Sequence, residues 1–176
     1  MIKTLLIETP LGEMAAAATK DGVCLLEFTS RPALESEFNR LALTFGETVT
    51  SGSNRHLRTL KKQLKEYFKG KRKEFSLPLI TVGTDFQIAV WNRLKNIPYG
   101  KTTSYLELAK SIKHPGAARA VAGANGSNRI AIIIPCHRVI GSDGDLVGYA
   151  GGLDKKKWLI DHEGKYSGKP IDGTLF

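Results

Sequence analysis

The sequence has no apolar stretch long enough to cross a lipid bilayer, which takes about 20 residues. Its longest strongly apolar run is Ile130 to Ile134. The first ten residues contain an acid, Glu8, and a proline, Pro10, where a secretory signal would need a continuous apolar segment. We therefore expect no membrane association, and a protein that is cytoplasmic, or nuclear if the source is a eukaryote.

Cysteine is scarce, with only Cys24 and Cys136 among 176 residues. Two cysteines are too few for a disulfide framework or a cysteine-rich zinc site. The four histidines do not replace them, because no two are three or four residues apart, the spacing of metal ligands on a helix. Nucleotide-binding motifs are missing as well. We expect no metal and no cofactor.

Acidic residues are outnumbered, 17 against 26 lysines and arginines, which leaves a formal charge of +9. Such an excess favours an anionic partner, and nucleic acid is the leading candidate. Between Arg55 and Lys73 there are nine cations and a single acid, Glu66. A basic run of this kind most often only keeps a helix face solvated, so its role stays open.

The length fits one compact domain or two small ones. In the first part, alternating apolar residues predict three strands in an antiparallel meander, and leucines three or four residues apart predict helices. The predicted elements are strands Ile2–Thr9, Met14–Thr19 and Val23–Phe28, then helices Ala33–Phe45 and Asn54–Phe68. We expect a small α/β N-terminal domain, residues 1–80, with a structural role.

A boundary is predicted between Leu77 and Gly83, after which the chain is mostly helical. The C-terminal domain is expected at residues 81–168, and residues 169–176 are expected to form a loose tail. Thr84 and Gln87 fit a capping box that begins a helix to about Lys95. A helix that begins at Thr103 or Ser104 and ends at about Ile112 follows, and a tight glycine-containing turn joins it to a helix Ala117–Ala124. This pattern predicts a helix-turn-helix. The predicted fold class is α+β.

The helix Ala117–Ala124 contains only alanine and glycine apart from Arg119 and Val121. Small side chains allow a close approach of the backbone, either to a neighbouring helix or to a nucleic-acid groove. The single long cation, Arg119, on a basic protein gives the groove and the packing interpretations equal weight. Beyond this helix we expect a turn at residues 125–128.

The two cysteines differ in their surroundings. Cys24 lies in the middle of a predicted strand, which indicates inert packing. Cys136 follows the run Ile130–Ile134, predicted as a buried strand, and precedes a histidine and an arginine able to lower the pKa of a thiol. Cys136 is therefore predicted to be a nucleophile, in a hydrolase or as a redox thiol. A last helix is expected from Asp154 to His162, ending at Glu163.

The segment Ile134-Pro135-Cys136-His137-Arg138-Val139 resembles the active-site motif of the O6-alkylguanine-DNA alkyltransferases, the methylated-DNA:protein-cysteine methyltransferases. The resemblance covers nearly the whole chain. Its other segments are Gln63–Gly70, Leu77–Leu79, Thr103–Tyr105, Ala118–Val121, Asn128, Gly148–Gly152, Trp158–Leu159 and His162–Gly164.

This resemblance implies a reaction in which Cys136 takes the alkyl group from O6-alkylguanine in a single turnover. His137 would receive the thiol proton through a water, Glu163 would orient His137, and Tyr105 would assist the departing guanine. Asn128 would brace the turn before the cysteine. No cofactor is implied for this transfer.

The resemblance also implies how DNA is held, with the small-residue helix in the minor groove and Arg119 in the place of a base rotated out of the stack. The winged-helix-like C-terminal domain would supply the contacts to DNA and to the rotated base. DNA-contacting residues would be Arg119, Tyr105, Ser104, Ala118, Gly123 and Ser142, and base-contacting residues would be Val139, Tyr149 and Ala150. The expected partner is double-stranded DNA containing alkylated guanine, with the protein as a monomer that needs no protein partner.

Other interpretations remain open from the sequence. Tyr105 could be a core tyrosine and Glu163 an ordinary surface acid, whereas Arg138 is expected to be structural, as a partner for buried carbonyls or an acid. A non-enzymatic DNA-binding or damage-signalling protein would need only the helix-turn-helix and the charge. A cysteine hydrolase would use Cys136, His137 and Glu163.

Overall fold

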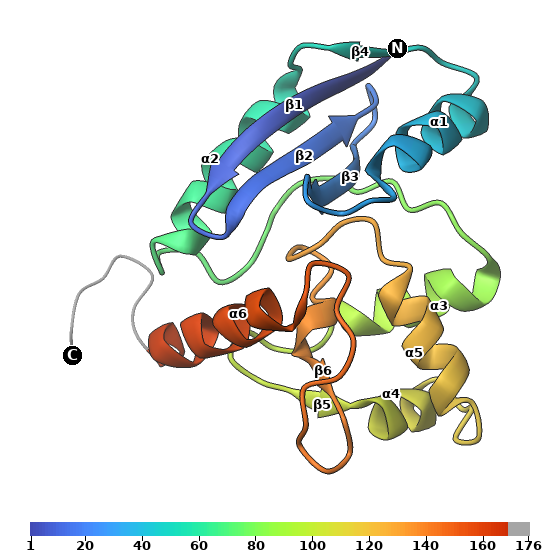
Figure 1. Ribbon diagram of the computed structural model, residues 1–176, viewed down its shortest axis with the longest axis vertical. Coiled ribbons are helices and arrows are strands. Elements are labelled where there is room, and N and C mark those ends of the chain that lie inside the picture. Colours follow the sequence, from blue (N-terminus) through green and yellow to red (C-terminus); the bar gives the residue numbers. More distant parts are fainter. Residues whose placement is uncertain (169–176) are drawn as a thin grey trace. The chain divides into compact units, whose positions relative to one another are not determined.

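The computed structural model describes residues 1–168, which form two compact units, Met1–Thr81 and a second that begins at Val82 (Figure 1). The predicted loose tail, residues 169–176, lies outside the described residues. Within the described residues, no helix combines the length and the apolar character needed to cross a membrane. Each unit has its own set of elements.

The N-terminal unit is built on a four-stranded sheet with the order β3-β2-β1-β4. The predicted meander is confirmed: β1 (Ile2–Thr9) pairs with β2 (Gly12–Ala18), and β2 pairs with β3 (Val23–Phe28), both antiparallel. The fourth strand, β4 (Val49–Ser51), runs parallel to β1 and was not predicted. Three residues are too few to show an alternating pattern.

Two helices pack against this sheet. Helix α1 (Leu34–Phe45) places Leu41 in one core cluster with strand residues such as Ala15 and Leu25. Helix α2 (Arg55–Phe68) contacts β1, β2 and β3. Asn54 caps α2, because its side chain accepts a hydrogen bond of 3.0 Å from the Leu57 amide.

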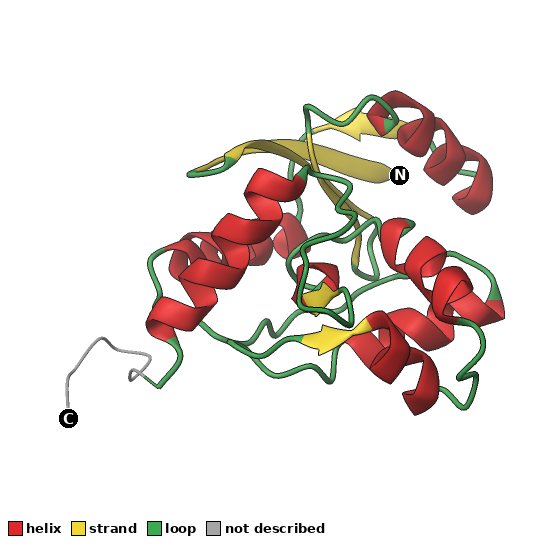
Figure 2. Ribbon diagram, turned by 60° about the horizontal axis from the view of Figure 1, so that its bottom comes forward, coloured by secondary structure: helices red, strands yellow, loops and turns green. Residues whose placement is uncertain are grey.

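The C-terminal unit is mainly helical, and its only strands among the described residues are two short parallel pieces (Figure 2). Helices α3 (Asp85–Leu94), α4 (Tyr105–Ser111) and α5 (Ala118–Gly126) pack against one another, and the capping box predicted for α3 is confirmed. Strand β5 (Thr103–Ser104) precedes α4 and pairs with β6 (Val139–Ile140).

One prediction is wrong where the chain approaches Cys136. The run Ile130–Ile134 is buried or nearly so, but it forms a tight turn instead of a strand. Its amides bond locally, from Ile133 to the Ala131 carbonyl at 2.8 Å and from Ile134 to the Ile130 carbonyl at 3.1 Å. An apolar run of five residues satisfies burial in either conformation, so its composition could not decide between them.

Two boundaries also differ from the predictions. The residues 125 and 126 belong to the end of α5, so the turn expected at residues 125–128 begins later. The last helix, α6 (Leu153–Tyr166), does not end at Glu163 but continues for three more residues. Glu163 is therefore inside the helix, and the helix packs against the segment that carries Cys136.

Candidate active site

Cys136 is the first residue of a short 3₁₀ helix, η1 (Cys136–Arg138), that follows the tight turn. Its amide bonds back to the Ile134 carbonyl at 2.8 Å, and its side chain is only 5% exposed. Ile132 in the preceding turn has a φ of 71°, a left-handed conformation that β-branched residues rarely adopt. The surrounding contacts must therefore hold this turn in place.

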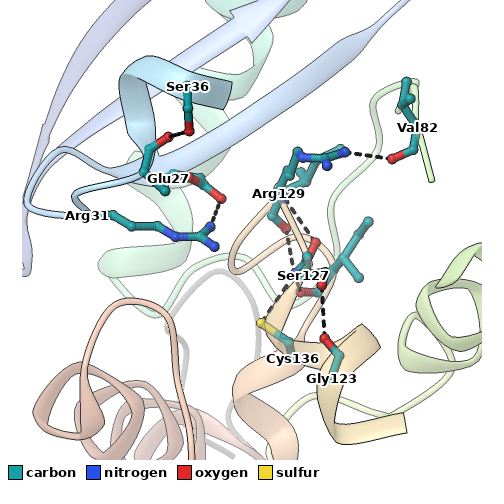
Figure 3. Close-up of polar contacts among 12 residues, drawn as sticks. Glu27, Arg31, Ser36, Val82, Gly123, Ser127, Arg129 and Cys136 are labelled. Carbon is teal, nitrogen blue, oxygen red and sulfur yellow. Dashed lines mark hydrogen bonds and ion pairs between the residues drawn. The ribbon is translucent and has the colours of Figure 1, made fainter. Parts of the chain in front are cut away.

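Asn128 makes several of those contacts with one buried side chain. Its amide nitrogen donates to the Ile134 carbonyl at 2.9 Å and lies 3.2 Å from the Cys136 sulfur, while its oxygen accepts from the Ile130 amide at 3.0 Å. The sulfur end of this contact is visible in Figure 3. Asn128 thus ties both ends of the tight turn to the thiol.

Asn125 is a second asparagine at the site, and sequence reasoning missed it. Its amide nitrogen donates to the Cys136 carbonyl at 3.3 Å, and its side chain is close enough to Tyr105 to affect the pKa of that hydroxyl. The sequence predicts a turn at Asn125. Because α5 is longer than predicted, Asn125 is instead buried at the end of the helix.

A buried cluster joins His137, Arg138 and Glu163. The His137 Nε2 atom is 2.7 Å from Glu163 Oε1, and Arg138 donates to both carboxylate oxygens at 2.8 and 2.9 Å. A further Arg138 nitrogen donates to the Ile97 carbonyl at 2.6 Å, and the Gly100 amide donates to Glu163 at 3.3 Å. The structural role expected for Arg138, as partner of an acid and a carbonyl, is confirmed.

The charges of this cluster determine which histidine nitrogen is basic. Burial alone would raise the pKa of Glu163, but the bonds and charges of His137 and Arg138 outweigh it, so the pKa of Glu163 is well below its ordinary value. Burial lowers the pKa of His137, although Glu163 acts in the opposite direction. A neutral His137 with Nε2–H donated to an ionised Glu163 keeps its lone pair on Nδ1. Nδ1 is buried and makes no hydrogen bond with the described residues.

Tyr105 and Lys156 form the other side of the site. The Tyr105 hydroxyl donates to the Val147 carbonyl at 3.0 Å, and Lys156 donates to the carbonyls of Val147 and Gly148 at 2.8 and 3.1 Å. The Lys156 nitrogen is 5.7 Å from the centre of the Tyr105 ring. Both side chains interact electrostatically with Cys136. Tyr105 is therefore at the site and not in an apolar core.

Burial governs the ionisation of both groups. It raises the pKa of the Tyr105 hydroxyl, which stays a proton donor at neutral pH. It lowers the pKa of Lys156 to about 8, although the nearby Cys136 acts in the opposite direction. Sequence reasoning missed Lys156, because it is the middle one of three consecutive lysines and nothing in that run indicates that one is buried.

The three residues expected at the base are in the segment after Cys136. Val139 is buried in β6, next to η1. Tyr149 is partly buried and Ala150 is exposed, and both belong to the loop between β6 and α6. Lys156 holds this loop through the carbonyls just before Tyr149.

The residues expected to contact DNA lie mainly on α5 and at the start of α4. Arg119 and Gly123 are both exposed and one helical turn apart, so they share one face of α5, and a side chain added at Gly123 would meet nothing within 4 Å. Ala118 is partly buried at the start of α5, Ser142 is exposed in the loop after β6, and Ser104 caps α4 through the Glu107 amide at 3.1 Å. The opposite face of α5, with Val121 and Ala124, is buried.

The exposed face of α5 therefore carries a long cation and otherwise small side chains. Helix packing, the alternative explanation for the small residues, uses the buried face, where Trp91 donates to the Ala124 carbonyl at 2.8 Å.

Among residues 1–168, no three His, Cys, Asp or Glu side chains lie together in a group that could hold a metal ion.

Comparison with known proteins covers both units. Residues 2–81 match the model of the 6-O-methylguanine DNA methyltransferase ribonuclease-like domain. Residues 85–165 match the model of the 6-O-methylguanine DNA methyltransferase DNA binding domain. The second match contains all the site residues described above.

Whole-chain relatives agree with these matches. A methylated-DNA--protein-cysteine methyltransferase of Methanosarcina acetivorans is 41% identical over 90% of this chain and 96% of its own. A crystal structure of the Mycobacterium tuberculosis O6-methylguanine methyltransferase is 38% identical over 98% of both chains, with a TM-score of 0.83. A crystal structure of the Mycobacterium tuberculosis OGT in complex with DNA is 39% identical over 97% of this chain and 96% of its own, with a TM-score of 0.78. Sequence, fold and site agree, and the chain belongs to the 6-O-methylguanine DNA methyltransferase family.

Proposed function

We propose that this protein is a DNA-repair methyltransferase that moves the alkyl group of O6-alkylguanine, once and irreversibly, onto the sulfur of Cys136. The observation that carries the proposal is the orientation of His137. Its Nε2 atom is held by Glu163 at 2.7 Å, so its basic Nδ1 atom is free to accept a proton, and the buried thiol belongs to the preceding residue, Cys136. A base next to a cysteine and oriented by an acid is the arrangement that activates a nucleophile.

The transfer is a displacement at the alkyl carbon. The thiol proton passes through a water to His137 Nδ1, the sulfur forms a bond to the alkyl carbon, and the bond from that carbon to O6 of guanine breaks. The electron pair of the broken bond stays on the guanine, which Tyr105 stabilises by donating a hydrogen bond or a proton. Glu163 stabilises the charged form of His137, and Arg138 keeps Glu163 ionised.

DNA binds through α5 and the start of α4. The exposed face of α5 enters the minor groove, because Gly123 and its small neighbours allow a close approach, and Arg119 fills the space left by the rotated nucleotide. Ser104, Ala118 and Ser142 support the contact with the backbone.

The rotated base meets the segment that follows Cys136. Main-chain groups at Val139 and Ala150 recognise its edge, and Tyr149 packs near it. Asn128 keeps the Cys136 sulfur in place through its contact at 3.2 Å. The protein acts as a monomer, without a cofactor or an obligate protein partner.

Intact-mass measurement tests the proposal. The protein is incubated with duplex DNA that contains O6-methylguanine, and with the same duplex containing guanine as a control. We expect the mass of one methyl group on the protein with the first duplex only, and a plateau of repaired guanine at about one equivalent per protein, because a thioether has no easy return to the thiol. An unchanged mass would indicate a DNA-binding protein without activity, and turnover of an ester substrate would indicate a hydrolase.

A further inference from the structure

Charge in the N-terminal unit is strongly segregated. Between Arg55 and Lys73 there are nine cations and one acid, whereas the remainder of residues 1–81 has four cations and eight acids. The segment is therefore basic within an otherwise acidic unit. The candidate active site does not use it, because every residue of that site follows Val82 in the chain.

The cations of α2 form an exposed surface without acidic partners. We define the α2 basic face as Arg58, Lys61, Lys62, Lys65 and Lys69, all of which are exposed. None of these five makes an ion pair with a described residue. The one acid of the segment, Glu66, is already bound by Arg72 at 2.6 Å. The charge of the face is thus not neutralised within residues 1–168.

Spacing along α2 brings like charges together. Lys61, Lys65 and Lys69 follow one another at four-residue intervals, and so do Arg58 and Lys62. Like charges four residues apart repel each other and destabilise a helix. The buried leucines on the opposite side of α2 stabilise its packing against the sheet. The repulsion between the cations makes no contribution to the stability of the fold. A bound polyanion would relieve it.

The lysines also border a small cavity. The cavity, of about 180 Å³, lies between α2 and the turn after β1. Its lining includes Lys61, Lys65 and Lys69, the apolar Leu64 and Phe68, and one acid, Glu8, so cations outnumber acids there by three to one. Cations at the edge of an apolar surface suit a backbone in which anionic phosphates alternate with less polar sugars, the groups that receive most protein–DNA hydrogen bonds.

We propose that the α2 basic face is a second DNA-binding surface, which contacts the phosphates of duplex DNA regardless of sequence or alkylation. Duplex DNA carries one charge for about every 1.7 Å of its axis. The lysines of one row on α2 are about 6 Å apart along the helix axis, so each can meet a phosphate. Such contacts hold the protein on undamaged DNA and let it slide to a lesion.

The test compares two double variants of the full chain that lose equal charge. Lys61→Gln with Lys65→Gln alters the α2 basic face, and Lys20→Gln with Arg40→Gln alters two exposed cations of the same unit outside it. Affinity for an undamaged, fluorescently labelled duplex is measured by anisotropy over a series of salt concentrations. The undamaged duplex makes the result independent of alkyl transfer.

For the first variant we expect weaker binding at every salt concentration, and a slope of log affinity against log salt that is shallower by about 1.8, since each lost phosphate contact removes about 0.9. The Lys20 and Arg40 variant should keep the slope of the unaltered protein. Melting temperatures should be unchanged or higher for the Lys61 and Lys65 variant, because it removes repulsion within α2.

Equal slopes of log affinity against log salt for the two variants would overturn the proposal. The α2 basic face would then affect DNA binding only through the net charge of the protein, or would have no effect. Polyglutamate serves as an anionic protein-like competitor. If the Lys61 and Lys65 substitutions weakened binding of polyglutamate but not of the duplex, the face would be a site for acidic protein partners and the proposal would be wrong.

Discussion

The two cysteines, one in each unit, are nearly equally buried but have opposite surroundings. Cys24 in β3 is 3% exposed and Cys136 in η1 is 5% exposed. The Cys24 sulfur contacts the Ala17 carbonyl at 3.5 Å, and burial raises the pKa of Cys24 to about 12. Cys136 instead contacts an asparagine amide and interacts with Tyr105 and Lys156. Burial therefore does not distinguish a reactive cysteine from an inert one; the polar groups around the sulfur do.

The two cysteines also differ in what determines the position of their backbone. The Cys24 backbone belongs to a strand of a regular sheet, and strand pairing determines its position. The Cys136 backbone follows an irregular turn that side chains hold in place, through Asn128 and Asn125. An irregular segment can place a side chain next to polar groups that the regular pairing of a sheet would exclude. Its backbone conformation must then be held by hydrogen bonds from other side chains.

Replacing each cysteine tests this contrast most directly, and the expected effect is the largest. Cys136→Ser should reduce alkyl transfer to background, because a hydroxyl supplies no usable anion at neutral pH. Cys24→Ala should keep transfer within about twofold, since a thiol held neutral in a sheet takes no part in it. Transfer to duplex and affinity by gel shift are measured together, and duplex affinity should change little in either variant. Transfer by the Cys136 variant would disprove the assignment of the nucleophile.

Removing the charge of Glu163 should have the next largest effect. Glu163→Gln leaves Arg138 without its buried partner, so we expect a loss of about 3–5 kcal/mol in the free energy of unfolding. Transfer to both duplex and free O6-benzylguanine should fall by about a hundredfold or more, because His137 loses the acid that orients it. Denaturant unfolding and rate constants on the two substrates provide the measurements.

The other unit offers a matched control for that change. Glu66 binds Arg72 at 2.6 Å, but both side chains are more than a quarter exposed. Glu66→Gln should therefore cost less than about 1 kcal/mol. Similar losses for the two substitutions would contradict the view that Glu163 holds a buried charged cluster together.

A smaller effect, confined to one substrate, is expected for Arg119→Ala. Rotating a base out of the duplex costs a few kcal/mol, part of which Arg119 offsets, so transfer from duplex should fall about tenfold or more. Free O6-benzylguanine has no stack to leave, and its reaction should change less than about twofold. Arg93→Ala, which removes an exposed arginine of α3, serves as the control. Equal losses on both substrates would place Arg119 in the fold or the thiol chemistry instead of the DNA stack.

The smallest expected effect is a pH dependence of the C-terminal unit. The pKa of His137 is lower in the folded protein than its ordinary 6.5, so below about pH 6.5 the unfolded chain binds more protons than the folded chain. The free energy of unfolding therefore decreases as the pH is lowered below that value. Glu163, whose pKa is lowered from 4.5, adds a second loss below about 4.5 by the same reasoning. Denaturant titrations between pH 7 and 3 should show both losses, and Glu163→Gln should remove the second. Stability that is constant over this range would contradict these ionisation states.

Regular elements were predictable because their signals are local. The meander and the capping box at Thr84 each depend on residues only a few positions apart, and the structure confirms both. The strand β4 and the tight turn at Ile130–Ile134 were missed, since one is too short to show a pattern and the other has an apolar composition that suits both a strand and a buried turn.

The sequence by itself determined the fold class, the excess of positive charge and the identity of the motif around Cys136, because composition and short motifs carry that information. The tertiary structure alone decided that Arg138, 25 residues before Glu163 of α6, shares the Glu163 carboxylate with His137, and that Lys156 is the buried member of its lysine run. It also brought Asn125 to the Cys136 carbonyl. The physical reason is that burial and pairing of polar groups depend on how distant segments pack, and a desolvated charge is tolerated only where that packing supplies its partners.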